Sequence, residues 1–112
     1  MTTQGDPADP SLYVLRIGDG PQAIMLGQSA TPDIDHFCLG MEGFDAERVT
    51  RTLAEHGVEA SIRHRDDSDP PAQELMIRDP DGIRVQIQDV SYCGGSGVLG
   101  NLCDPKDRPR SR

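Results

Sequence analysis

The segment DPDGIRVQIQDV, residues 79–90, constrains the fold of this chain more than any other stretch. Its first four residues are typical of a tight turn, and the residues after them alternate between apolar and polar side chains. Successive side chains of a strand point to opposite faces of its sheet. We therefore expect Val85 and Ile87 on an apolar face, and a polar face that carries Arg84, Gln86 and Gln88.

Four elements are predicted before this strand, in the order strand, helix, strand, strand. The helix should follow the N-cap residue Asp45 and end before Gly57, so it covers about residues 45–56. In the strand that precedes it, Phe37 and Leu39 are expected to contact the core, with His36 on the opposite face. The strands are predicted over 34–39, 61–65, 74–78 and 83–90.

A smaller unit is predicted over residues 12–28. The runs 12–17 and 22–26 favour strands, and the turn-forming residues between them predict a hairpin. Residues 1–11 contain two prolines, one glycine and no apolar periodicity, so we expect a flexible lead-in. Residues 91–112 are expected to form a Gly-rich loop and a charged tail that ends in KDRPRSR.

The predicted hairpin and the final strand show a short internal repeat. Placing Gly20 over Gly82 aligns GDGPQAIMLGQ with PDGIRVQIQDV at an offset of 62 residues. Under that offset the counterpart of Gln86 is Ile24. If two copies of one module exist, the first copy lacks its opening strand and helix.

The composition excludes some classes of partner. Aromatic residues make up 4% of the chain and Trp is absent, so base-stacking platforms are lacking. A net charge of -8 repels phosphate backbones, which argues against nucleic acid and favours a neutral or cationic small molecule, with simple solubility as the alternative. No apolar run approaches the roughly 18 residues that cross a bilayer, so we expect no membrane partner.

The cellular setting follows from the first residues and from the cysteines. The opening MTTQGDPADP lacks the basic and apolar blocks of a secretory signal, and we expect a cytoplasmic protein. Three cysteines are an odd count, which favours free thiols. Pairing of Cys93 with Cys103 across a Gly-rich loop is the alternative.

The order strand, helix and three strands, with His36 in the first strand and a DPDG turn before the last, resembles the vicinal oxygen chelate superfamily. This superfamily includes glyoxalase I, bleomycin-resistance proteins and extradiol dioxygenases. The supporting motifs are IDHFCLG (34–40) and RDPDGIRVQIQDV (78–90). The resemblance implies an α+β fold with a complete βαβββ module at 34–90 and a remnant β-hairpin of a second module at 12–28. Paired modules would form a concave cleft, and we expect a homodimer in which each chain supplies what the other lacks.

Metal sites in that superfamily take a His from the first strand of a module and usually a Glu four residues beyond the DPDG glycine. The matching positions here are His36 and Gln86. Gln is a ligand among glyoxalase I relatives, but a carboxylate suits a hard divalent cation better because it also brings charge. We therefore expect hydrogen-bonded pocket walls without a cofactor. The alternative is a divalent metal (Zn, Ni, Fe or Mn) held by His36 and Gln86 of two chains in a homodimer.

Other side chains on the same predicted face complete the candidate site. Glu74 shares its strand face with Met76 and Arg78, and is the candidate general base. Cys38 lies two residues from His36, although a small buried residue without chemistry is the alternative. The candidate ligand-binding residues are Cys38, Met76, Arg84 and Gln88.

Three functions remain open from the sequence. The first is a small-molecule binding protein of the glyoxalase or bleomycin-resistance type. The second is a metal-dependent enzyme of the same superfamily: a glyoxalase-like lyase, an isomerase or an extradiol dioxygenase, in which the ion polarises substrate oxygens. The third is a shortened subunit that associates with a longer relative.

Overall fold

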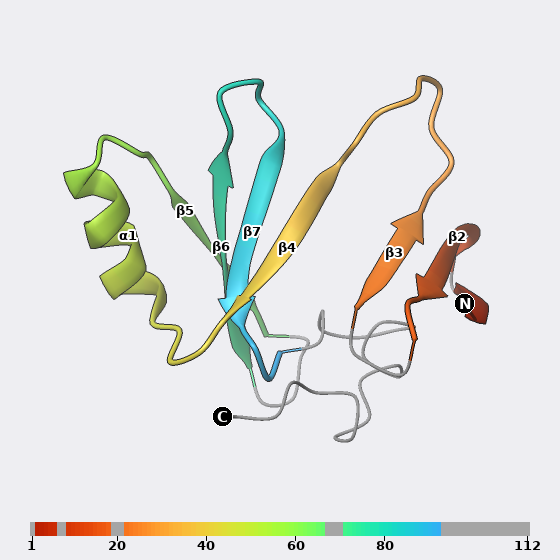
Figure 1. Ribbon diagram of the computed structural model, residues 1–112, viewed down its shortest axis with the longest axis horizontal. Coiled ribbons are helices and arrows are strands. Elements are labelled where there is room, and N and C mark those ends of the chain that lie inside the picture. Colours follow the sequence, from red (N-terminus) through yellow and green to blue (C-terminus); the bar gives the residue numbers. More distant parts are fainter. Residues whose placement is uncertain (1, 7–8, 19–21, 67–70, 93–112) are drawn as a thin grey trace. The chain divides into compact units, whose positions relative to one another are not determined.

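The computed structural model describes residues 2–6, 9–18, 22–66 and 71–92 and shows an α+β fold with one helix and two sheets in this part of the chain (Figure 1). The described residues fall into two compact units. Unit 1 contains those up to Pro32, and unit 2 spans Asp33–Tyr92. Cys93, Cys103 and the predicted tail beyond residue 92 lie outside the described residues. No helix in the described ranges has the length and apolar character needed to cross a membrane.

Unit 2 is built on a four-stranded sheet with the order β4-β7-β6-β5 (Figure 1). β4 pairs with β7 in parallel, and the pairs β7–β6 and β6–β5 are antiparallel. The predicted order of strand, helix and three strands is confirmed. The bounds are β4 His36–Met41, α1 Ala46–Glu55, β5 Ser61–Arg65, β6 Ala72–Arg78 and β7 Arg84–Asp89.

The turn between β6 and β7 forms as the DPDG segment predicts. The Asp79 side-chain Oδ1 accepts the backbone N–H groups of Asp81 (2.9 Å) and Ile83 (2.8 Å). Gly82 adopts a φ of +86°, which a residue with a side chain rarely adopts. Asp79 and Ile83 close the hairpin through a backbone hydrogen bond of 2.9 Å. This turn fixes the register of the two central strands.

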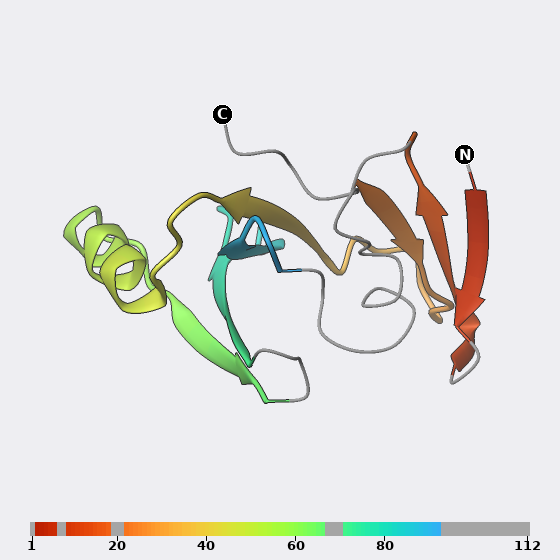
Figure 2. The same ribbon diagram turned by 90° about the horizontal axis from the view of Figure 1, so that it is seen from below.

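The helix α1 also begins where its N-cap predicts. The Asp45 carboxylate accepts the backbone N–H of Arg48 at 3.0 Å, and Gly57 takes a φ of +73° just beyond the helix. The helix packs against β5 and β6, and Figure 2 shows it on one side of the unit 2 sheet. Below it, Leu75 is fully buried and Val85 is 7% exposed.

The expectation that Phe37 and Leu39 contact the core is wrong. Their side chains on β4 are 46% and 50% exposed, and that of Met41 is 38% exposed. The alternation of β4 is as predicted, but α1 covers only the β5 and β6 part of the apolar face. An apolar side chain on the uncovered part of a sheet face stays in contact with solvent.

Unit 1 is a three-stranded antiparallel sheet with the order β1-β2-β3. Its strands are β1 Thr2–Asp6, β2 Asp9–Arg16 and β3 Ala23–Leu26. The predicted hairpin is present as β2 and β3, but the expectation of a flexible lead-in over residues 1–11 is wrong, since β1 and the start of β2 lie there. Ladder hydrogen bonds join backbone groups, so a strand can form where side chains show no apolar periodicity. The hairpin is therefore part of a larger sheet.

The internal repeat has a structural counterpart with a shifted register. The last pair before the turn is Arg16 with Ala23 in unit 1 and Arg78 with Arg84 in unit 2, so the unit 1 turn is one residue longer. Superposing these closing pairs places Met25, not Ile24, at the position of Gln86. The offset of 62 residues holds for β2 but not for β3, because a sequence offset ignores the extra turn residue.

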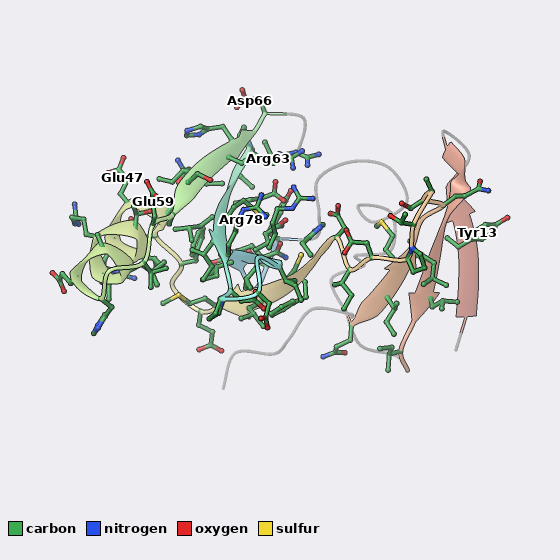
Figure 3. All side chains as sticks on the ribbon, turned by 90° about the horizontal axis from the view of Figure 1, so that it is seen from above. Tyr13, Glu47, Glu59, Arg63, Asp66 and Arg78 are labelled. Carbon is green, nitrogen blue, oxygen red and sulfur yellow. The ribbon has the colours of Figure 1, made fainter. Side chains whose placement is uncertain are left out.

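Most apolar side chains that the structure describes in the unit 1 sheet are exposed. Val14 is fully buried, whereas its neighbour Tyr13 is 48% exposed and Leu26, the cross-strand partner of Tyr13, is 51% exposed. Figure 3 shows Tyr13 projecting from the sheet. The face that corresponds to the helix-covered side of unit 2 thus has no helix on it among the described residues.

The burial of Leu75 predicts a large loss of stability for Leu75→Ala. Truncation of a fully buried leucine costs about 2–5 kcal/mol because it removes buried apolar surface and leaves a cavity. The loss in free energy of unfolding can be measured by urea denaturation, with the NMR signals of unit 2 as the probe of folding. Ile34→Ala is the control, since Ile34 is 61% exposed and its truncation should cost less than about 1 kcal/mol. Equal losses in both variants would contradict the placement of the core.

Candidate functional site

The register of unit 2 places the predicted site residues on one face of its sheet, which we call the polar face. Gln86 on β7 lies opposite Cys38 on β4 and opposite Met76 on β6. Paired residues point to the same side of a sheet, so the alternation then fixes every other position. The polar face contains all seven candidates: His36, Cys38, Glu74, Met76, Arg84, Gln86 and Gln88.

A partly buried hydrogen-bond chain crosses the polar face. The Gln86 side chain is buried, and its Nε2 donates to Glu74 Oε2 (2.5 Å) and to Gln88 Oε1 (2.7 Å). The Gln88 Nε2 donates in turn to the backbone carbonyl of Tyr92 (3.0 Å). Both amide groups are oriented by these contacts. Gln86 therefore holds its position through neighbouring side chains rather than through solvent.

Glu74 is the buried charge at one end of this hydrogen-bond chain, with its side chain 3% exposed. Arg63 Nε and Arg65 Nη1 both lie 3.6 Å from Glu74 Oε1, an oxygen that accepts no hydrogen bond from the described residues. A buried carboxylate needs such cations to offset its lost hydration. Glu74 thus anchors two arginines, and its role as a general base stays a prediction.

Cys38 has a thiol that is poorly suited to nucleophilic chemistry. Burial, together with the negative charge of Glu74, raises the pKa of the Cys38 thiol to about 11. The thiolate is the reactive form, so at neutral pH this thiol is almost entirely protonated. The residue as a whole remains exposed, so Cys38 is not the small buried residue that the sequence left open.

His36 belongs to a second cluster at the start of β4. Its Nδ1 lies 2.6 Å from Asp35 Oδ2, and Arg84 Nη2 donates to Asp35 Oδ1 at 2.6 Å. The hydrogen bond with His36 lowers the pKa of Asp35; desolvation opposes this effect, and the charge of Arg84 adds to it. Sequence reasoning missed Asp35 because strand alternation assigns it to the other face. It precedes β4, where that alternation does not apply.

The geometry of His36 and Gln86 does not provide a complete metal site within one chain. His36 lies opposite Arg84, and Gln86 lies opposite Cys38, so the two predicted ligands are diagonal neighbours. In the ranges that the structure describes, no group of three His, Cys, Asp or Glu side chains could hold an ion. Two donors without a carboxylate are too few for the metals considered.

The other arginines of the polar face were not assigned to the site from the sequence. Arg63 and Arg65 occupy alternate positions of β5, which places both on one face. Figure 3 shows Arg63 on the side of the sheet that faces away from α1, and Glu47 on α1 itself. Their i, i+2 spacing in the sequence indicates that both side chains lie on one face of the strand. Charged side chains on an outer strand are usually only exposed to solvent, so the spacing alone did not point to a site.

Comparison with known proteins finds no match to a family model, a curated protein or a solved structure.

The pKa of Cys38 predicts slow alkylation at this residue. At pH 8, iodoacetamide should modify Cys38 about a hundredfold more slowly in the folded than in the unfolded chain, because its thiolate fraction falls with the shift from 9.0 to about 11. Peptide mass spectrometry distinguishes Cys38 from the other cysteines. Glu74→Gln should speed the reaction and Glu59→Gln, at an exposed position, should not. A rate unchanged by unfolding would refute the assignment.

Proposed function

We propose that this protein is a small-molecule binding protein of the glyoxalase and bleomycin-resistance type, with the polar face of unit 2 as its binding surface. The observation that carries the proposal is the hydrogen-bond chain that joins buried Glu74 and Gln86 to half-buried Gln88. Amide and carboxylate groups fixed by one another present oriented donors and acceptors to a ligand. The solvated side of an ordinary sheet does not require this arrangement.

Two features of unit 2 support the choice of superfamily. Its elements follow the order that carries the resemblance, with β4, α1, β5, β6 and β7 in sequence. The DPDG turn places Gln86 in the middle of the final strand, on the same face as His36. These positions match the two that supply metal ligands in the superfamily that the sequence resembles.

A homodimer is part of the proposal. β4 is an edge strand whose outer side has no partner strand among the described residues. It exposes three apolar side chains in a row, Phe37, Leu39 and Met41. Exposed apolar rows on an edge strand favour association. A second copy of the chain is the proposed partner, and it would bring two polar faces into one assembly.

The metal-dependent enzyme is the second candidate, and one observation favours it. Asp35 contacts His36 Nδ1, as carboxylates do with metal-binding histidines, and this leaves Nε2 as the ligand atom. Because one chain supplies only His36 and Gln86, we assign no reaction step to a metal. Metal analysis of protein purified without chelator tests this candidate: a stoichiometric ion that is lost in His36→Ala would favour the enzyme over the binding protein.

The binding proposal predicts that a small aromatic probe contacts the polar face. We expect at least one of benzoate, phenyl phosphate, benzylammonium and benzyl alcohol to shift the side-chain amide NMR signals of Gln86 and Gln88. Gln88→Met should lower the affinity for that probe about tenfold, because it removes one side chain of the Glu74–Gln86–Gln88 hydrogen-bond chain.

The matched control is Gln73→Met, an exposed position of β6 on the opposite face. This variant should keep the affinity of the wild type within about twofold. If none of the four probes perturbs Gln86 or Gln88, the polar face is only structural and the proposal fails.

The dimer proposal predicts a change of mass in solution. Native mass spectrometry should find a dimer for the wild type and a monomer for Leu39→Glu, since a charge in the apolar row of β4 opposes association. Thr52→Glu, on the exposed side of α1, is the charge-matched control and should remain dimeric. A monomeric wild type would contradict the proposal and favour the third function, a subunit that needs a longer relative.

A further inference from the structure

The polar face carries an unusual share of the positive charge of this acidic chain. The whole chain has a net charge of -8 and ten arginines. The register of β5, β6 and β7 brings four of the ten to this one face: Arg63, Arg65, Arg78 and Arg84. The local charge of the proposed binding surface is thus opposite in sign to the charge of the protein.

Few carboxylates on this face offset these arginines. Arg63 and Arg65 share a single oxygen of Glu74, at 3.6 Å each. Arg84 contacts Asp35, which is largely exposed. Arg78 donates from Nη1 to the neutral carbonyl oxygen of Gly82 (2.8 Å). In the part of the chain that the structure describes, three of the four guanidinium groups thus contact two carboxylates, and Arg78 contacts a neutral oxygen.

Arg78 and Arg84 have one carboxylate contact between them, that of Arg84 with Asp35. They are directly opposite each other on the antiparallel strands β6 and β7, so their side chains leave the same face at neighbouring positions. Like charges directly opposite across a sheet are destabilising. Among the described residues, the nearby Asp79 carboxylate forms no ion pair with either arginine, and its Oδ1 accepts backbone N–H groups within the turn.

The same row continues onto β4, where His36 lies opposite Arg84. His36 on β4, Arg84 on β7 and Arg78 on β6 are therefore neighbours in one row across the sheet, at the end where the β6–β7 turn lies. Asp35 contacts two of them, His36 and Arg84. An anion beside Arg78 and Arg84 would remove the remaining repulsion.

We propose that Arg78 and Arg84 clamp an oxyanion group, a carboxylate or a phosphate, of the small molecule that binds the polar face. This inference rests on the proposed function and names the class of its ligand. It replaces the expectation of a neutral or cationic ligand, which came from the net charge of the whole chain. That sum includes exposed acidic residues such as Glu47 on α1 and Glu59, which do not belong to the polar face.

Both guanidinium groups are oriented before a ligand arrives. The contact with Gly82 uses Nη1 of Arg78, and the contacts with Asp35 use Nε and Nη2 of Arg84. Each guanidinium keeps other N–H donors beyond those contacts, in the planar fork that suits a carboxylate or a phosphate. A prearranged pair loses less conformational freedom on binding.

The test compares four probes at constant ionic strength: benzoate, phenyl phosphate, benzylammonium and benzyl alcohol. We expect benzoate, phenyl phosphate or both to shift the Nε–H NMR signals of Arg78 and Arg84. Arg78→Gln and Arg84→Gln should each weaken that binding at least about tenfold. Arg51→Gln, on the exposed surface of α1, should change it less than about twofold. If only benzoate binds, the natural ligand carries a carboxylate. If only phenyl phosphate binds, it carries a phosphate.

A second pair of variants covers the case in which a glutamine variant does not fold. Arg78→Lys and Arg84→Lys keep the charge but lose the fork, so they should fold and bind the anion more weakly than the wild type. Equal affinity of both lysine variants and the wild type would refute the clamp.

Other outcomes separate the clamp from the proposed function. If chloride produces the same shifts as the two anions, or if benzylammonium or benzyl alcohol binds the polar face in their place, the clamp is refuted and small-molecule binding stands. If no probe binds that face, both proposals fail.

Discussion

The turn between β6 and β7 is the constraint on which unit 2 depends. Asp79 accepts two backbone N–H groups and Gly82 supplies the positive φ, so the two central strands can pair in one register only. A slip of one residue would exchange the two faces of β7. Leu75 and Val85 would then lose their common apolar side, and Gln86 would lose its contact with Glu74.

Once the register is fixed, the two faces of the sheet have separate physical roles. The apolar face buries Leu75 and Val85 near α1, which gives unit 2 its core. The polar face holds a buried carboxylate, and the cost of burying that charge explains why Arg63 and Arg65 are beside it. Glu74 therefore fixes the positions of side chains that a ligand would contact.

The sequence predicted the elements whose determinants are local. The cap at Asp45, the glycine at 57 and the DPDG turn each act within a few residues, and each is found where it was expected. Phe37 and Leu39 were misplaced because their exposure depends on which strands a distant helix covers. β1 was missed because backbone pairing needs no side-chain pattern. The candidate site residues share a face as alternation predicts, but the contact of Asp35 with His36 and Arg84 required the strand ends to be known.

The parallel pairing of β4 with β7 also has a consequence for how unit 2 is assembled. Asp35 and Arg84 are 49 residues apart in the sequence, whereas the β6–β7 hairpin closes within a few residues. Contacts between distant residues form more slowly because a long loop must close first. The hairpin and α1 can therefore form early, and β4 must join them afterwards. Until it does, Gln86 has Met76 beside it but not Cys38, so the polar face is complete only at the end of folding.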